Sequence, residues 1–307
     1  MSLETAQVNV KVVTKKEKSS SPMRIAFRRL AKNKLAMGAL IFIVLMFLIC
    51  FLGPLFLQYD INSISVANKN KAPNAAHWVG TDSLGRDVLL RLMLAGRVSL
   101  TVGLAVTAIS VFIGTVLGAI SGFYRGIVDT LIMRLADIIS SIPSLPLLII
   151  FGVLLSDFKV EPTHRLFYVM GMLGFISWPG LARLIRSQIL TMREQEYMVA
   201  TEALGLKDSR KIFKHLIPNT IPTVIVSATL GVAGAILAES GLSFLGLGVV
   251  PPTPTWGNMI GAATNWIDFS TRPWLWVPPG LCILAIAIAI NFLGDGLRDA
   301  LDPKLKR

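Results

Sequence analysis

Charged residues are scarce in this sequence. Asp, Glu, Lys and Arg make up only 16% of its 307 residues, against about 25% in typical soluble domains. Cysteine and histidine are rarer still, with two Cys and three His, and none has the spacing of a metal site. Because Cys50 and Cys282 both fall in apolar stretches, we expect no structural disulfide and no bound metal.

Motifs for nucleotide binding and catalysis are also missing. The sequence contains no Gly-x-x-x-x-Gly-Lys-Ser/Thr loop, so the chain should not bind ATP itself. His77, His164 and His215 lie between the apolar stretches, and no catalytic constellation is found. This argues against an intramembrane enzyme and predicts a chain with no activity or cofactor of its own.

Long apolar runs dominate what is present. Hydrophobic residues make up 53% of the chain, and six blocks contain no Lys, Arg, Asp or Glu. A helix needs about 20 such residues to cross a bilayer. We therefore predict an all-α integral membrane protein with six transmembrane helices: Ala36–Leu57, Ser99–Gly122, Ile138–Ser156, Leu166–Ala182, Thr220–Ala238 and Pro273–Gly294.

The basic residues follow the predicted topology. A net charge of +12 invites a nucleic-acid-binding interpretation, but all 30 Lys and Arg lie outside the six blocks. With the N-terminus in the cytoplasm, 22 of them fall in inner segments and 8 in outer segments. This positive-inside bias predicts that both termini are cytoplasmic, and it leaves membrane lipid, not nucleic acid, as the expected partner.

The blocks divide the chain into predicted regions: a basic cytoplasmic tail (1–35), the first span (36–57), an external loop with an interfacial helix after Asp87 (58–98), a five-helix core (99–296) and a second cytoplasmic tail (297–307). Within the tail, residues 22–34 are either a short surface helix or a basic flank that orients the first span.

Glycines and prolines give details of the predicted spans. Gly114, Gly118 and Gly122 recur at a spacing of four, which predicts close approach to another helix. Prolines in the third and fourth blocks predict kinks, which are either simply tolerated or line a pathway that opens and closes: Pro143, Pro146 and Pro179.

A long polar loop, 183–219, separates the fourth and fifth spans. It predicts a helix over 194–204, a left-handed C-terminal cap at Gly205, and a second helix that Asp208 caps and Pro218 ends. The second helix has an apolar side. That side either packs on the inner ends of the protein's own helices or docks into a groove of a partner protein.

This loop resembles the signature loop of bacterial ATP-binding cassette (ABC) importer permeases. That signature reads Glu-Ala-Ala, three residues, Gly, nine residues, Ile-x-Leu-Pro. Ala200, Gly205 and Pro218 match it at the right spacing. The sequence departs from it at four other positions: Val199, Thr201, His215 and Ile217.

Two further stretches resemble the dipeptide, oligopeptide and nickel permeases. They are Gly80–Val88 and Leu242–Gly257. With the six spans, the resemblance covers residues 22–307 and is greatest to the second permease subunit of a peptide importer. It implies the type I (MetI-like) permease fold and a place in the bacterial cytoplasmic membrane.

The resemblance also implies partners and a mechanism. The partners are a second, homologous permease, two ATPase subunits that carry ATP and Mg²⁺, and an external substrate-binding protein. Di- and oligopeptides are the first expectation for the substrate, and nickel or glutathione are the alternatives. A stand-alone secondary transporter or channel is the alternative of another class, although the spans contain almost no ionisable groups.

Site residues fall into two groups. The resemblance implies that the first group forms the ATPase-coupling segment: Val199, Ala200, Thr201, Glu202, Ala203, Leu204, Gly205, His215, Ile217 and Pro218. The other group consists of candidates for an outer gate or a binding-protein contact: Glu239, Pro251, Pro252, Trp256, Asp82, Arg86 and Asp87. Glu239 is either solvated at the outer interface or part of the gate. Asp82, Arg86 and Asp87 are expected to form local ion pairs.

Overall fold

The computed structural model describes residues 22–57 and 64–302. In these residues all regular structure is helical, apart from one isolated bridge between Thr81 and Asp87. The all-α prediction is therefore confirmed. Most of the predicted N-terminal tail, six residues of the external loop and the last five residues of the C-terminal tail lie outside the described residues.

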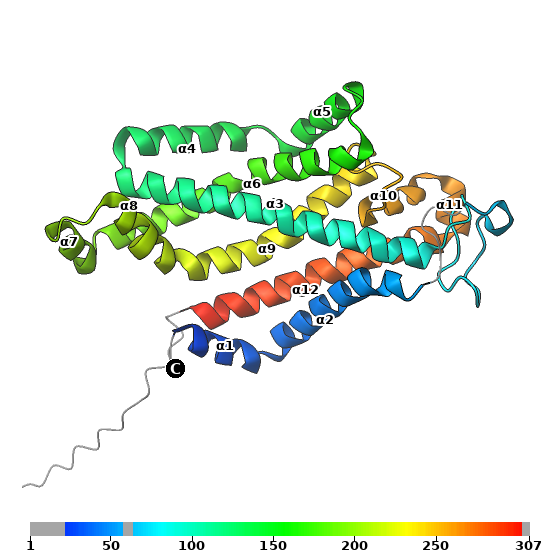
Figure 1. Ribbon diagram of the computed structural model, residues 1–307, viewed down its shortest axis with the longest axis horizontal. Coiled ribbons are helices and arrows are strands. Elements are labelled where there is room, and N and C mark those ends of the chain that lie inside the picture. Colours follow the sequence, from blue (N-terminus) through cyan, green and yellow to red (C-terminus); the bar gives the residue numbers. More distant parts are fainter. Residues whose placement is uncertain (1–21, 58–63, 303–307) are drawn as a thin grey trace, which may run out of the picture.

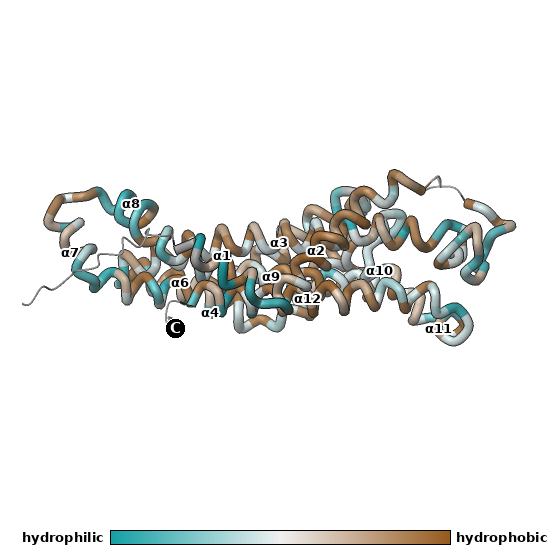
Figure 2. Tube along the Cα trace, turned by 90° about the horizontal axis from the view of Figure 1, so that it is seen from below, coloured by the Kyte–Doolittle hydropathy of each residue, from teal (hydrophilic) through white to brown (hydrophobic). Residues whose placement is uncertain are grey.

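Five helices are long and apolar enough to cross a membrane. They lie side by side in one elongated bundle, in which α3 packs on α6 and α9, and α12 packs on α9 and α2 (Figure 1). Hydrophobic residues dominate the middle of the bundle, and hydrophilic ones gather toward its two ends (Figure 2). The helices are α2 (Lys34–Leu52, followed by η1, Gly53–Leu55), α3 (Val88–Tyr124), α6 (Pro162–Arg193), α9 (Ile217–Phe244) and α12 (Val277–Leu301).

The third predicted span is not one straight helix. The chain forms α4 (Gly126–Ser141) and α5 (Ser144–Asp157), bent by 80° at the break between them. Ile142 precedes Pro143 and has extended backbone angles, as expected where the proline ring disfavours the helical conformation of the preceding residue. With 14 residues, α5 is about 21 Å long, less than the hydrocarbon thickness of about 30 Å.

The predicted interfacial helix is not a separate element. The chain runs from Val88 into the second span as one helix of 37 residues, and the Asp87 side chain caps it by accepting from the Leu90 amide at 2.8 Å. Such a helix is about 55 Å long. It therefore extends well beyond the thickness of a bilayer.

The spaced glycines of α3 face α6. A Cβ atom at Gly118 would lie 2.5 Å from the carbonyl oxygen of Ala182, and one at Gly122 would lie 2.8 Å from Cβ of Ile189. Any side chain at these positions would push the helices apart. The predicted close packing is confirmed, and the sequence did not reveal that α6 is the partner.

A helix also forms in the basic segment before the first span. This helix, α1 (Pro22–Lys32), packs on α12 and α2. Leu30 is buried in a small cluster with Ala36 and Ala300. Arg29 donates to the carbonyl oxygen of Asp302 at 3.3 Å, so α1 contacts the residue that follows α12.

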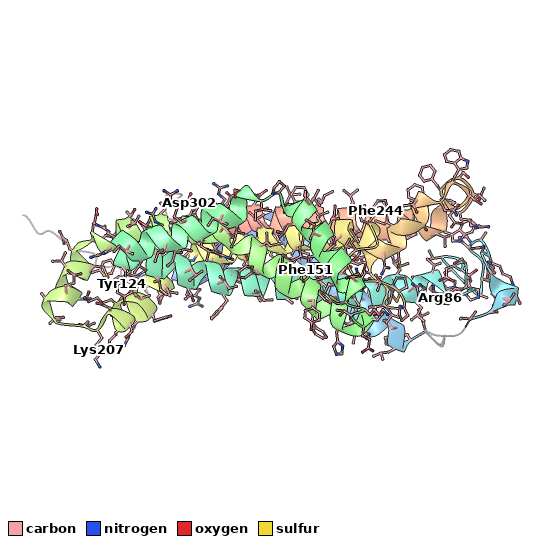
Figure 3. The ribbon with its side chains drawn as sticks, turned by 90° about the horizontal axis from the view of Figure 1, so that it is seen from above. Arg86, Tyr124, Phe151, Lys207, Phe244 and Asp302 are labelled. Atoms are coloured by element: carbon pink, nitrogen blue, oxygen red, sulfur yellow. The ribbon has the colours of Figure 1, made fainter. Side chains whose placement is uncertain are left out.

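Short helices occupy the two ends of the bundle. One end, called the α7 end here, has α7 (Glu196–Ala203), α8 (Asp208–Arg210) and a π-helical stretch, η3 (Lys211–Leu216). The other, the α11 end, has η2 (Val66–Asn68), α10 (Trp256–Ile260), η4 (Gly261–Thr264), α11 (Trp266–Thr271) and η5 (Pro273–Leu275). Lys207 and Arg86 mark these opposite ends in Figure 3.

Candidate functional site

The loop at the α7 end begins with a well-capped helix. Gly205 follows α7 with φ of +67°, a conformation that glycine adopts without steric cost. The amide of Gly205 donates to the carbonyl of Glu202 at 2.9 Å, and the amide of Leu206 donates to that of Thr201 at 3.2 Å. These two bonds form a Schellman motif, so the predicted glycine cap is present.

The second helix of this loop differs from its prediction. Asp208 is the first residue of α8, not its cap, and no side-chain cap is found there. The helix does not end at Pro218. It continues through η3 into α9, with Pro218 just after the π-helical stretch, where the regular α-helical hydrogen-bond pattern is already interrupted. The loop is thus rigidly joined to a membrane helix.

One side of this loop packs on the protein's own helices. Met198 from α7 and two residues of η3, Ile212 and Leu216, are buried in a cluster with Ile185 and Ile189 of α6. Thr201 is buried beside them, and its hydroxyl donates to the carbonyl of Met198 at 2.7 Å. Packing on the ends of the protein's own helices therefore accounts for part of the apolar surface.

The other side of the loop is apolar and exposed. Val199, Leu204 and Phe213 are 60%, 77% and 58% exposed. The remaining signature residues surround them. Ala200, Glu202, Ala203, Gly205 and Pro218 are exposed, and His215 and Ile217 are half-buried. The segment 196–216 therefore presents three large apolar side chains at the tip of the molecule, and we call it the coupling element.

At the α11 end, one of the predicted local ion pairs forms, between Asp82 and Arg86. Asp82 accepts from Arg86 at 2.7 Å, and Nε of Arg91 lies 3.5 Å from the same carboxylate. Asp87 pairs with Nδ1 of His77 at 2.8 Å while it caps α3. Both acids therefore have a local role in holding the start of α3.

Glu239 is fully buried, so the interpretation that it is solvated at the interface is wrong. Its carboxylate accepts from the hydroxyls of Ser243 at 2.6 Å and Ser99 at 3.3 Å, and Ser240 lies at 3.5 Å. Among the residues that the structure describes, no cationic side chain pairs with it. Ser99 in turn accepts from the amide of Trp256 at 3.2 Å, and Ser243 accepts from that of Val249 at 3.0 Å. The carboxylate thus links α3, α9 and the segment 249–256.

Trp256, another candidate for the outer gate or the binding-protein contact, is also buried. It packs beside Cys50 and Ala95, and its Nε1 donates to the carbonyl of Leu92 at 3.1 Å. Pro251, by contrast, lines a cavity of about 250 Å³ with Asp82 and Arg86. The fold therefore brings three of the predicted outer residues together, with Pro252 exposed beside them and Trp256 in the core.

No group of three or more metal-ligating side chains occurs in residues 22–57 and 64–302. Both cysteines are unpaired thiols.

Two family models match the sequence. A model described as a binding-protein-dependent transport system inner membrane component matches residues 114–307, which is more than half of the chain. A model of the N-terminal membrane domain of oligopeptide transport permease C matches residues 21–73. The chain belongs to the family of binding-protein-dependent transport system inner membrane components.

Curated relatives cover nearly the whole chain. An oligopeptide transport system permease protein of Bacillus subtilis is 40% identical over 95% of this chain and 92% of its own length. A dipeptide transport system permease protein of Alkalihalophilus pseudofirmus is also 40% identical, over 93% of this chain and 91% of its own length. A glutathione transport system permease protein of Pectobacterium atrosepticum is 34% identical, over 93% and 92%. The chain is therefore a multi-pass membrane permease subunit of an ABC importer.

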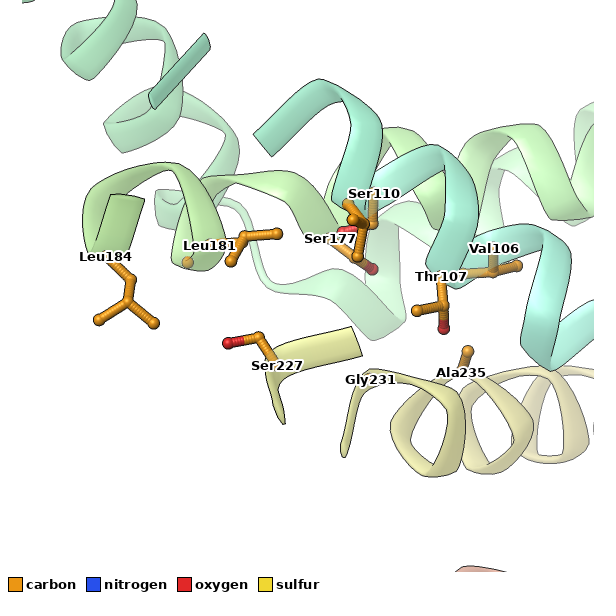
Figure 4. A pocket seen from close by; sticks show the side chains of 11 residues that line it. Val106, Thr107, Ser110, Ser177, Leu181, Leu184, Ser227, Gly231 and Ala235 are labelled. Carbon is orange, nitrogen blue, oxygen red and sulfur yellow. The ribbon is translucent and has the colours of Figure 1, made fainter. Parts of the chain in front are cut away.

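The structure reveals one site that was not predicted from the sequence. A cavity lies between α3, α6 and α9, lined by hydroxyl groups from blocks predicted only as spans (Figure 4). Thr and Ser are common in membrane helices, because their hydroxyls can bond to the backbone of the preceding turn. Ser177 is one that does so, since its hydroxyl donates to the carbonyl of Leu173 at 2.7 Å, whereas Thr107 makes no such bond within the described residues.

Proposed function

We propose that this permease subunit imports di- and oligopeptides. It would pair with a second, homologous permease, with two ATPase subunits at the α7 end and with an external substrate-binding protein at the α11 end. Most of the curated relatives compared, at 37% to 40% identity, are peptide permeases. In this arrangement the α7 end is cytoplasmic, as the basic residues of loop 183–219 predict.

The coupling element supports this proposal most directly. Val199, Leu204 and Phe213 project from a segment whose opposite side is packed on α6. Exposed apolar side chains on a well-ordered helix favour a protein partner with a matching groove. An ATPase subunit of the importer is the partner whose groove this segment would enter.

The connection from this element into the bundle supports a mechanical role. The helix from Asp208 continues through η3 into α9 without a flexible joint, and Met198 packs with residues of α6. A displacement of the ATPase would therefore move α6 and α9 directly. Shifting a two-state equilibrium from 1:99 to 99:1 takes about 5.5 kcal/mol of differential binding, which ATP binding by the partner subunits would supply.

The α11 end would hold the outer gate and the contact with the binding protein. Glu239 fastens the segment 249–256 to α3 and α9 through hydroxyl groups. The exposed Pro252 and the charged cavity at Asp82 and Arg86 lie on the same end. We assign gating to the Glu239 network and binding-protein contact to that charged surface.

Co-purification tests the coupling role. Phe213→Glu places a charge where an apolar contact is proposed, so the ATPase subunits should no longer co-purify with the permease pair. Gly205→Pro should have the same effect, because proline cannot adopt the φ of +67° found there. Ile267→Glu is the matched control, since Ile267 is equally exposed but lies in α11 at the opposite end.

Transport itself tests the wider proposal. The assembled complex in proteoliposomes should take up labelled di- and oligopeptides only with ATP and the binding protein. Uptake of nickel or glutathione without peptide uptake would mean that one of these, and not peptide, is the substrate. Uptake by this chain alone would contradict the proposal altogether, as would normal co-purification of Phe213→Glu and Gly205→Pro.

A further inference from the structure

The cavity between α3, α6 and α9 lies in the middle of the bundle and is lined largely by small and hydroxyl-bearing residues. It measures about 210 Å³, and no Asp, Glu, Lys or Arg side chain lines it. Hydroxyl groups and glycines form much of its wall (Figure 4): Thr107, Ser110, Ser177, Gly180, Ser227 and Gly231. We call it the hydroxyl cavity.

Thr107 has a polar atom with no partner inside the chain. Its residue is only 7% exposed, and its Oγ1 makes no hydrogen bond within the part of the chain that the structure describes. Elsewhere on the same helix, Thr101 donates to the carbonyl of Arg97 at 2.7 Å. Figure 4 shows the Thr107 side chain projecting toward α9. A buried, unpaired hydroxyl is costly. Because the Thr107 oxygen is covered in this conformation, we expect it to gain a hydrogen-bonding partner when the helices move during transport.

The hydroxyl cavity is incomplete in this subunit. Ser177, Gly180 and Gly231 are exposed at its open side. Ligand pockets usually enclose about 300–1,000 Å³, so this volume is too small to be a whole site. Lipid chains cannot bond to hydroxyls, and the homologous permease proposed above would supply the missing wall.

A second cavity adjoins the first. It measures about 450 Å³, shares Leu184 and Ser227 with the hydroxyl cavity, and extends to Gln188, Thr223 and Arg298. Arg298 lies near the C-terminal end of α12, so the path leads from the middle of the bundle toward the proposed cytoplasmic side. Charged side chains line it only at that mouth.

We infer that the hydroxyl cavity is this subunit's half of the substrate passage, in which Thr107, Ser110 and Ser227 hydrogen-bond the main chain of a passing peptide. The inference rests on the proposed function and names the residues of that passage. A hydroxyl both donates and accepts, so it can bond to either the N–H or the C=O of any peptide unit. Because no charged side chain lines the hydroxyl cavity itself, this part of the passage would accept acidic, basic and apolar side chains alike.

Removing the Thr107 hydroxyl tests this directly. Thr107→Val keeps the side-chain shape, and it should not weaken folding, because the hydroxyl has no partner to lose. In the complete complex in proteoliposomes, we expect KM for labelled di- and tripeptide uptake to rise about threefold to tenfold. The rise should be similar for acidic, basic and neutral peptides. Thr101→Val is the matched control, since that hydroxyl bonds to its own helix.

A second measurement does not depend on kinetics. Ser227→Cys places a thiol in the wall shared by both cavities. In the complex, a water-soluble thiol reagent should label it beyond the background of Cys50 and Cys282, and saturating dipeptide should slow the labelling several-fold.

The outcomes separate the inference from the proposed function. If the wild-type complex takes up peptides while Thr107→Val leaves KM unchanged and peptide fails to protect Ser227→Cys, the passage lies elsewhere and this inference is wrong. An effect restricted to peptides of one charge would also overturn it. If the wild-type complex takes up no peptide at all, the proposed function fails first.

Discussion

The environment of Glu239 is set by hydroxyl groups instead of a cation. Ser99 and Ser243 each donate a hydrogen bond to the carboxylate, and each accepts one from a backbone amide of the segment that follows α9. Each serine therefore connects the Glu239 carboxylate to the backbone of the segment 249–256. A residue that the sequence only marks as an acid after an apolar run is in fact the centre of a network that joins three parts of the chain.

Two substitutions of Glu239 should distinguish the effect of its charge from the effect of its size. Glu239→Ala removes the acceptor from two buried hydroxyls, which costs roughly 1–3 kcal/mol for each unsatisfied group. We expect a clearly lower unfolding temperature of the detergent-purified complex. Glu239→Gln keeps the volume and one acceptor, so the complex should assemble normally but transport peptide more slowly.

Thermal unfolding and uptake measured on the same preparations distinguish the two effects. Ser270→Ala serves as control, because Ser270 is exposed and bonds only to the backbone of its own helix. Transport by Glu239→Gln at the wild-type rate would show that Glu239 is not part of the gate. An unchanged unfolding temperature for Glu239→Ala would show that the network contributes little to stability.

At the scale of helices, α3 and α6 form the most extensive contact, and glycine makes it possible. Gly118 and Gly122 let the backbone of α3 approach Ala182 and Ile189 of α6. Without a hydrophobic force between helices in lipid, such close packing is the main source of their association.

Enlarging one of these glycines should loosen the bundle. Gly118→Leu places a side chain where even a Cβ atom would lie 2.5 Å from the Ala182 carbonyl. We expect a loss of roughly 1–3 kcal/mol or more from overpacking, seen as a lower unfolding temperature and poorer yield. Gly234→Leu is the matched control, because a Cβ at Gly234 meets nothing within 4 Å. Equal stability of the two variants would contradict this account of the contact.

Apolar runs predicted the existence of the helices well and their continuity poorly. The third block was predicted as one span, yet Pro143 bends it sharply, while Pro179 and Pro218 lie within helices that continue. A proline is tolerated in a helix where neighbouring groups replace the hydrogen bond that it removes, and it breaks the helix where they do not. Which of these happens depends on the packing of the bundle. The same limit explains why α3 begins at Val88, where the interfacial pattern and the apolar block merge.

For the candidate site, local signals were predictable and burial was not. The glycine cap at Gly205 and the acid pairs near Asp82 follow from residues close in sequence. The sequence left the burial of Glu239 open and did not indicate that of Trp256, because their partners Ser99 and Leu92 lie more than a hundred residues away. The hydroxyl cavity was missed for the same reason, since three separate helices build it.

At the scale of the whole molecule, the two ends carry different chemistry. The α7 end has an apolar tip amid basic residues, and the α11 end has paired charges and a lid of short helices. Lys207 and Arg86 lie at these opposite ends (Figure 3). Such an asymmetric molecule can work in only one orientation across a membrane.

Labelling from one side of the membrane tests that orientation. Lys207→Cys and Ser83→Cys each place a thiol at an exposed position, one at each end. Because 22 of the 30 basic residues fall in segments predicted to face the cytoplasm, an impermeant maleimide added to intact cells without an outer barrier should label only Ser83→Cys. Lys207→Cys should react only after the membrane is opened, and the unsubstituted chain measures the background from Cys50 and Cys282. Labelling of Lys207→Cys in intact cells would place the coupling element outside, beyond the reach of any cytoplasmic ATPase, and the proposed direction of transport would have to be abandoned.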